Sequence, residues 1–344
     1  MKIKLLIATA DEVYAKLLSD NISEHHSDTL DVSVCCTLER LNETEATKNY
    51  EVALLDTKFS EHINTDRIHL PILLWSENET STEQSGTFEK INKYQRISSV
   101  VATILERYAK ISAVKSNTEL RQANISAVWS PAGGVGKTSV AIAYALSYSS
   151  KDSISKEKEV FYLNLENFSS IPGYFTENGR SISSVFEMLE STEGNIEMFI
   201  QGISSHDKNI TFLSSPDNYD DMCILSNENV KELVSSCAKL ADELIIDLSC
   251  ACDIRVKEIF EMANKIFIVT DKTSTAGIKL TQFMTQNNVF ELIKDKVTIV
   301  ANKDAVIDEP KCGSVISLPY LQAVDTCALC TSLSEYFSKE LDLV

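Results

Sequence analysis

Residues 130–138 carry the strongest chemical signal in the chain, a run that reads Ser-Pro-Ala-Gly-Gly-Val-Gly-Lys-Thr. Its glycines let the backbone curl so that successive N–H groups can point at phosphate oxygens. Lys137 places a positive charge where β- and γ-phosphates would lie, and the Thr138 hydroxyl can ligate Mg²⁺. Pro131 stands where the general pattern G-x-x-x-x-G-K-[ST] has its first glycine. The spacing predicts a phosphate-binding loop, and a glycine-rich turn with a chance lysine is the alternative.

A carboxylate that could hold Mg²⁺ follows about one hundred residues later. Residues 243–247 read Glu-Leu-Ile-Ile-Asp, an apolar strand that brings Asp247 to the carboxyl edge of a parallel sheet. Taken alone, such an aspartate is more often a strand-terminal residue that caps a turn. Its position after a phosphate loop instead indicates a metal ligand, with Thr138 as a second protein ligand.

Alternating strands and helices must position these residues. An apolar strand over 125–129 precedes the loop, and apolar periodicity predicts a helix over 138–149, whose positive dipole end would face the phosphates. Further apolar strands are predicted at 160–165, 210–213, 244–248, 265–270, 297–301 and 314–318. Helices fit between most of them, which indicates an α/β fold with a mostly parallel sheet.

Residues 125–344 resemble the MinD/ParA ATPases, whose deviant Walker A loop is similar to residues 133–138. Residues 160–167 lie where that family has a strand followed by Asp-x-Asp, and residues 243–247 resemble its Walker B strand. Residues 297–303 and 316–319 resemble the late strands of the family, whose ends flank adenine. The resemblance implies a P-loop NTPase with a mostly parallel sheet flanked by helices. It also implies binding of ATP or ADP with Mg²⁺, and a homodimer.

The resemblance further assigns roles to individual residues. It implies that the nucleotide is bound by Gly133, Gly134, Val135, Gly136, Lys137, Thr138, Ser139, Asn302 and Pro319. Thr138 and Asp247 would hold Mg²⁺, and Lys137 and Glu166 would act in catalysis.

Three departures from the family pattern limit which properties of the family we expect in this chain. The family's signature lysine, which crosses to the partner subunit's ATP, is replaced by Ala132. The Asp-x-Asp pair is replaced by Asn164 and Glu166, and the longer side chain of Glu166 moves a carboxylate that could orient water. Residues 332–344 are net acidic, unlike the basic amphipathic helix that targets MinD to membranes. We therefore expect nucleotide binding, weak hydrolysis and no direct membrane insertion.

Residues 1–110 show a separate series of alternating strands and helices, and they resemble response-regulator receiver domains. Residues 50–56 read Tyr-Glu-Val-Ala-Leu-Leu-Asp, similar to the strand that ends in the phosphoacceptor aspartate, and residues 91–95 lie where receivers have Lys-Pro. The resemblance implies a flavodoxin-like (βα)5 fold. Receivers bind Mg²⁺ through two acidic residues after the first strand, but Thr9 and Ala10 stand there in this chain.

The chain as a whole is expected to contain an atypical receiver-like domain over 1–110, a linker over 111–124 into which a helix could continue, and an ATPase domain over 125–344. This arrangement is similar to that of the TadZ/CpaE proteins of pilus assembly, as are residues 93–96, 130–131 and 161–166. The resemblance implies an ATP-binding, weakly hydrolysing, dimerising switch that localises or organises a Tad/Flp-type machine. A non-hydrolysing, ATP-bound scaffold or signalling adaptor that acts through the receiver-like domain is the alternative.

The same resemblance implies partners and a location. The partners would be pilus-assembly or secretion proteins, which would bring a cytoplasmic protein to the cell pole or the inner face of the membrane. The 50 acidic and 32 basic residues give a net charge of −18, which opposes nucleic-acid binding, including a role in DNA segregation. No apolar run approaches the roughly 18 residues that span a bilayer. The nine cysteines are odd in number, which suits reduced thiols.

We predict that Asp56 neither accepts phosphate from acetyl phosphate nor binds beryllofluoride. Without carboxylates at positions 9 and 10 there is no divalent site, so the charge of an aspartyl phosphate would lack compensation and would repel Asp11. Mass spectrometry of the treated protein checks this expectation. A stoichiometric adduct at Asp56 would contradict it.

Overall fold

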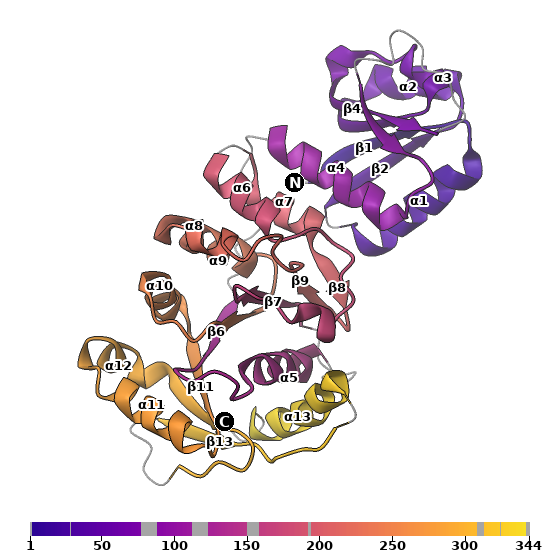
Figure 1. Cartoon of the computed structure of the whole chain (residues 1–344). Helices are drawn as coiled ribbons and strands as arrows, with labels where there is room; N and C mark the ends of the chain where they lie inside the picture. Colours follow the sequence, from indigo (N-terminus) through magenta and orange to yellow (C-terminus); the bar gives the residue numbers. More distant parts are fainter. Residues whose placement is uncertain are drawn as a thin grey trace. The chain divides into compact units, whose positions relative to one another are not determined.

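The computed structural model describes residues 2–27, 29–76, 88–111, 123–149, 158–191, 194–307, 313–323 and 325–341. The chain divides into two compact units, Met1–Thr118 and Glu119–Val344 (Figure 1). Each unit has its own sheet, and the helices of each unit pack on that sheet.

The first unit is built on a five-stranded parallel sheet with the strand order β2-β1-β3-β4-β5. The strands are β1 (Ile3–Ala8), β2 (Leu30–Cys35), β3 (Tyr50–Leu55), β4 (Ile68–Trp75) and β5 (Glu89–Asn92). Its helices are α1 (Glu12–His25), α2 (Leu38–Thr47), α3 (Thr57–Ser60) and α4 (Ile97–Ile111), with a 3-10 turn at Thr65–Arg67. This strand order is the doubly wound order of flavodoxin-like folds.

Aliphatic side chains explain why these segments form a sheet with covered faces. Strands β1 and β3 are buried along most of their length, as expected for central strands of a parallel sheet. Helix α4 buries the apolar face that the periodicity of the sequence predicts, which consists of Val100, Val101, Ile104 and Leu105. Helix α1 begins at a cap, because the Asp11 side chain accepts a hydrogen bond from the Tyr14 N–H.

The second unit contains an eight-stranded sheet with the strand order β13-β12-β11-β6-β10-β7-β9-β8. The strands are β6 (Asn124–Trp129), β7 (Val160–Leu165), β8 (Ser205–Asp207), β9 (Ile210–Phe212), β10 (Glu243–Leu248), β11 (Lys265–Thr270), β12 (Val297–Ala301) and β13 (Ser314–Ser317). All neighbouring pairs are parallel except β8 and β9. The sheet is therefore mostly parallel, as predicted.

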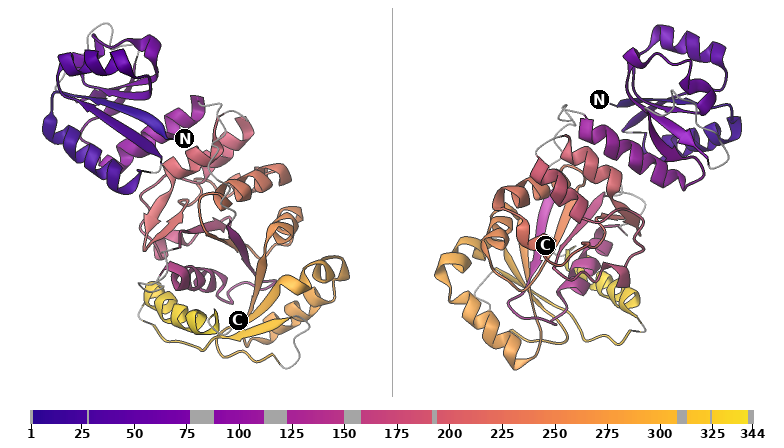
Figure 2. Two further views of the ribbon diagram at one scale, coloured as in Figure 1. Left: turned by 180° about the vertical axis from the view of Figure 1, so that it is seen from behind. Right: turned by 45° about the horizontal axis from the view of Figure 1, so that its top comes forward.

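Helices cover both faces of this sheet. They are α5 (Lys137–Ser149), α6 (Ser183–Ser191), α7 (Ile196–Ile203), α8 (Asp221–Ile224), α9 (Asn227–Ala238), α10 (Ile254–Met262), α11 (Ser274–Met284), α12 (Asn287–Ile293) and α13 (Thr326–Leu341). Two 3-10 turns span Ile171–Gly173 and Lys294–Lys296. Helices α5 and α13 lie side by side (Figures 1 and 2). Their Tyr144 and Phe337 rings pack edge to face. On the opposite face, Trp129 of β6 packs against Phe260 of α10.

The observed elements differ from the predicted ones mainly at short or polar segments. The periodicity of the sequence gives no signal for β5 or β8, because neither is a continuous apolar run. The expected linker over 111–124 differs by one residue at each end, since α4 includes Ile111 and β6 begins at Asn124. Residues 112–122 of that linker lie outside the described residues. Among the described helices, none has the length and apolarity that crossing a bilayer requires.

Candidate functional site

The predicted phosphate loop lies between the buried central strand β6 and the first turn of α5. Gly134 and Gly136 have φ angles of +75° and +95°, a region that glycine adopts at little cost. The N-terminus of α5 contributes the positive end of its dipole to the same place. This strand, curled loop and helix together form a backbone cradle for an anion.

Lys137 begins α5, and its charged side chain is only 7% exposed. Its ammonium nitrogen lies 3.5 Å from Glu166 Oε1 and 3.4 Å from Cys250 Sγ. Glu166 follows β7 and Cys250 follows β10 by two residues, and in the sheet β10 lies between β6 and β7. The structure thus brings the two predicted catalytic residues, Lys137 and Glu166, into contact. From the sequence, Cys250 is interpreted as an ordinary core or surface thiol, because its contact with Lys137 depends on where β10 ends.

Asp247 is completely buried near the end of β10. Its Oδ2 atom accepts hydrogen bonds from the Tyr162 hydroxyl at 2.9 Å and from the Asn164 side-chain amide at 3.3 Å. No residue that the structure describes forms a hydrogen bond with its Oδ1 atom. Burial, reinforced by the nearby Glu166 carboxylate, raises the pKa of Asp247 to about 7, although the Thr138 hydroxyl opposes this increase.

These oxygen atoms fit a bound Mg²⁺ ion. A buried carboxylate oxygen without a partner is an atom that a cation would satisfy, and Thr138 presents its hydroxyl to the same carboxylate. Mg²⁺ typically binds to one or two protein oxygens together with waters and substrate phosphates. Within the described part of the chain, no group of three or more His, Cys, Asp or Glu side chains could hold a metal. The protein oxygens Thr138 Oγ1 and Asp247 Oδ1 suit an ion that a nucleotide helps to hold.

Two residues that follow β12 hold the phosphate loop from the side. The Asn302 side-chain amide donates a hydrogen bond to the Val135 carbonyl at 2.8 Å. The Lys303 ammonium donates to the Gly134 carbonyl at 2.9 Å and lies 3.4 Å from Asp271 Oδ2. Asn302 therefore uses its amide to position the loop backbone. The contact of Lys303 with the loop was not predicted from the sequence, because a lysine after a strand has no distinctive spacing, although it directly follows Asn302.

The other predicted nucleotide-binding residues contribute in different ways. The Val135 side chain is buried in the core, so only its backbone is available to a nucleotide. The Ser139 hydroxyl lies 3.2 Å from that of Tyr174. Pro319 follows β13 and is partly buried. Ala132, which stands in place of the signature lysine, is buried in the same core cluster as Val135.

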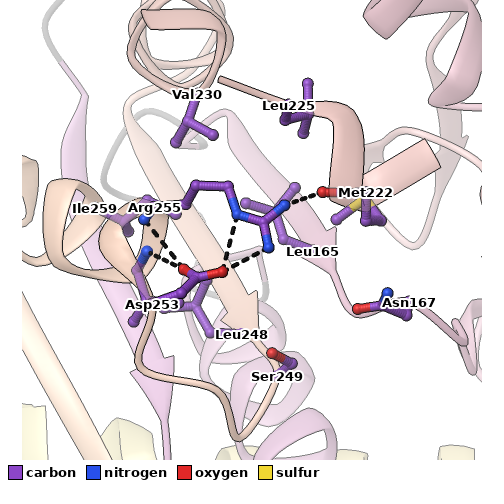
Figure 3. Close-up of a pocket in the computed structure, with 11 residues that line it drawn as sticks. Leu165, Asn167, Met222, Leu225, Val230, Leu248, Ser249, Asp253, Arg255 and Ile259 are labelled. Carbon is purple, nitrogen blue, oxygen red and sulfur yellow. Dashed lines mark hydrogen bonds and ion pairs between the residues drawn. The ribbon is translucent and has the colours of Figure 1, made fainter. Parts of the chain in front are cut away.

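A small cavity lies near the carboxyl ends of β7 and β10, lined by apolar side chains that include Leu165 and Leu248 (Figure 3). Its volume of about 40 Å³ suits little more than one water molecule and is far below the roughly 300 Å³ of ligand pockets. The Arg255 guanidinium lies there and pairs with Asp253 and with the Met222 carbonyl. The cavity is thus too small to be a nucleotide site.

In the first unit, Lys93 lies between the carboxylates of Asp11 and Asp56. The Thr9 hydroxyl donates to Asp56 Oδ2 at 2.9 Å, and the Lys93 ammonium lies 3.7 Å from the same oxygen and 3.5 Å from Asp11 Oδ2. Both carboxylates also cap helices, Asp11 that of α1 and Asp56 that of α3. The Tyr14 N–H at the α1 cap is the main reason why the pKa of Asp11 lies below its usual value. The Asp56 carboxylate therefore already has protein partners.

The sequence matches no protein-family model, and a comparison with curated proteins finds no match either. Solved structures do match. A ParA family ATPase from Chlorobium tepidum aligns with a TM-score of 0.52 and 15% identity, over 64% of this chain and 99% of that one. A chain of the MinC:MinD cell division protein complex from Aquifex aeolicus aligns with a TM-score of 0.47 and 15% identity, over 64% of this chain and 97% of that one. The septum site-determining protein MinD from Pyrococcus horikoshii, complexed with Mg-ADP, aligns with a TM-score of 0.46 and 13% identity. This alignment covers 64% of this chain and 98% of that one.

The ParA family structure establishes the fold of the second unit. The second unit makes up about two thirds of the chain, which agrees with the 64% that the alignment covers, whereas the first unit alone is too short to account for it. The second unit therefore has the same α/β fold as this ParA family ATPase structure. At 15% identity the likeness is one of fold.

We expect Gly136→Ala to destabilise the protein by about 1–3 kcal/mol, because φ is positive and a Cβ would lie close to the Asn302 amide. That Cβ would be 2.6 Å from Asn302 Nδ2, in the bond that holds Val135. Gly133→Ala is the matched control, since its Cβ would have only ordinary contacts, the nearest at 3.8 Å. Calorimetric unfolding measures both variants. Equal melting temperatures would contradict the positioning role of Asn302.

Proposed function

We propose that the second unit binds Mg·ATP and Mg·ADP and acts as an ATP-dependent switch. One observation carries the proposal: at the phosphate loop, the Lys137 ammonium lies beside Glu166, and the unpartnered Oδ1 of Asp247 lies nearby. Loop N–H groups and the α5 dipole would bind the phosphates, and Lys137 would turn from Glu166 to the β- and γ-phosphates. Thr138 and Asp247 would hold Mg²⁺, which when bound neutralises developing phosphate charge.

We propose further that hydrolysis is slow. Ala132 is a buried methyl group and supplies no charge toward a second subunit. Stabilisation of transition-state charge by such a cation is worth several orders of magnitude in related reactions. Glu166 is 22% exposed and close to Lys137, so it can accept a hydrogen bond from a water near the terminal phosphate.

The same site supports assembly into a homodimer through the nucleotide face. Gly133 and Gly134 are exposed and have no side chains, so two phosphate loops can approach across a two-fold axis. We assign the switch to pilus assembly of the TadZ/CpaE type, with pilus-assembly or secretion proteins as partners. Those proteins would place the chain at the cell pole or the inner face of the membrane.

A non-hydrolysing scaffold is the second candidate, and one observation favours it. The Glu166 carboxylate, which is expected to orient water, is paired with Lys137. In this case ATP would be a fixed ligand that keeps the second unit in one conformation, and the receiver-like first unit would be the interaction surface.

Lys137→Ala should weaken ATP binding about tenfold or more, or about 1.4 kcal/mol, because only backbone dipoles would then bind the phosphates. Calorimetric titration of the full chain measures the change. Lys279→Ala is the control, since Lys279 is an exposed lysine of α11. Equal ATP affinity in the wild type and in Lys137→Ala would refute the nucleotide assignment.

Glu166→Gln should abolish the remaining hydrolysis while ATP affinity stays within about threefold, because the amide keeps the shape but cannot serve as a base. Single-turnover hydrolysis under excess enzyme measures both proteins. A wild-type protein that binds ATP but never hydrolyses it would support the scaffold. A wild-type rate of many turnovers per second would contradict slow hydrolysis.

A further inference from the structure

Cys250 is an exposed thiol beside the phosphate loop. The Lys137 ammonium donates to its sulfur at 3.4 Å, and a Cβ at Gly133 would lie 3.8 Å from the same atom. The sulfur therefore faces the loop between its first glycine and its lysine. In the proposed function, this is where the terminal phosphates lie.

A second, independent observation marks this place as a ligand site. Asp247, three residues before Cys250, is completely buried, and its Oδ1 atom has no hydrogen-bond partner among the described residues. The Thr138 hydroxyl and the Lys137 ammonium both oppose the increase that burial causes in the pKa of this carboxyl, so they lie close to it. Lys137, which contacts Cys250, is therefore also close to a buried carboxylate oxygen that a bound cation would satisfy. A bound phosphate chain would compete with Cys250 for Lys137 and would cover the sulfur.

We propose that Cys250 is a modification site whose accessibility the nucleotide controls, and that its modification in turn blocks the nucleotide. The reagent class is a low-molecular-weight disulfide. The Cys250 sulfur forms a bond with one sulfur of the disulfide, whose S–S bond breaks, and the second sulfur leaves as a thiol that takes up the proton lost by Cys250. No net oxidant is needed, because one disulfide is exchanged for another.

The consequence is reciprocal exclusion. A group attached to Cys250 would stand between Gly133 and Lys137, and ATP would have to displace it. By linkage, whatever excludes ATP from the modified form also protects the thiol in the ATP-bound form. The inference rests on the proposed nucleotide binding, and it adds sensitivity to thiol chemistry.

Cys223 provides an internal comparison on the same chain. It is also exposed, but its sulfur lies 3.6 Å from the Asn167 amide instead of from a loop lysine. A nucleotide at the phosphate loop has no direct reason to cover it. A general change in reactivity would therefore alter both thiols, whereas the proposed effect is confined to Cys250.

The first experiment treats the full chain with iodoacetamide, with and without Mg·ATP, and follows each cysteine by peptide mass spectrometry. We expect saturating Mg·ATP to slow Cys250 alkylation about tenfold or more and to leave Cys223 unchanged. Equilibrium dialysis measures ATP binding in the same samples. Absence of binding would overturn the proposed function and this inference together. Binding without protection of Cys250 would overturn the inference alone.

The second experiment uses glutathione disulfide as the reagent. The modified full chain should lose ATP affinity about tenfold or more, and dithiothreitol should restore it. Cys250→Ser, compared with its own untreated sample, should show no loss on the same treatment. If Cys250→Ser loses affinity as the wild type does, another thiol is responsible and the inference is wrong. Unchanged affinity of a fully modified wild type would also refute it.

Discussion

The buried ammonium group of Lys137 needs a counter-charge and hydrogen-bond acceptors. To supply them, residues at the ends of three neighbouring strands of the larger sheet meet at one place. An unpaired charge at 7% exposure would cost several kcal/mol, so partners must come from other segments. Glu166 reaches it from the end of β7 and Cys250 from beyond β10. Because the strands are parallel, their carboxyl ends meet at one edge, and the charge of the loop is balanced there before any ligand arrives.

The loop also depends on support from the other side of β6. Asn302 and Lys303 follow β12, two strands away, and bind the carbonyls of Val135 and Gly134. These bonds fix the loop carbonyls and leave its N–H groups for an anion. Gly136 has no Cβ that would displace Asn302. The sheet therefore shapes the phosphate cradle from both sides.

The first unit shows the opposite arrangement of charge. There a lysine, Lys93, lies between the carboxylates of Asp11 and Asp56, and the Thr9 hydroxyl binds Asp56 as well. At the loop of the second unit the central buried charge is the Lys137 ammonium beside the Glu166 carboxylate, whereas here one ammonium lies between two carboxylates that also cap helices.

The sequence alone was enough to predict the phosphate loop, because its glycines, Lys137 and Thr138 lie within nine contiguous residues. It also predicted most strands of both sheets, since long apolar runs separated by amphipathic helices form parallel sheets almost independently of context. The short strands β5 and β8 were not predicted, because their pairing partners stabilise them and their own residues do not. Only the tertiary structure decided that Cys250 and Lys303 contact the loop and that Asp247 Oδ1 lacks a partner. These contacts join segments more than one hundred residues apart, and they depend on strand order, which hydrophobic periodicity does not encode.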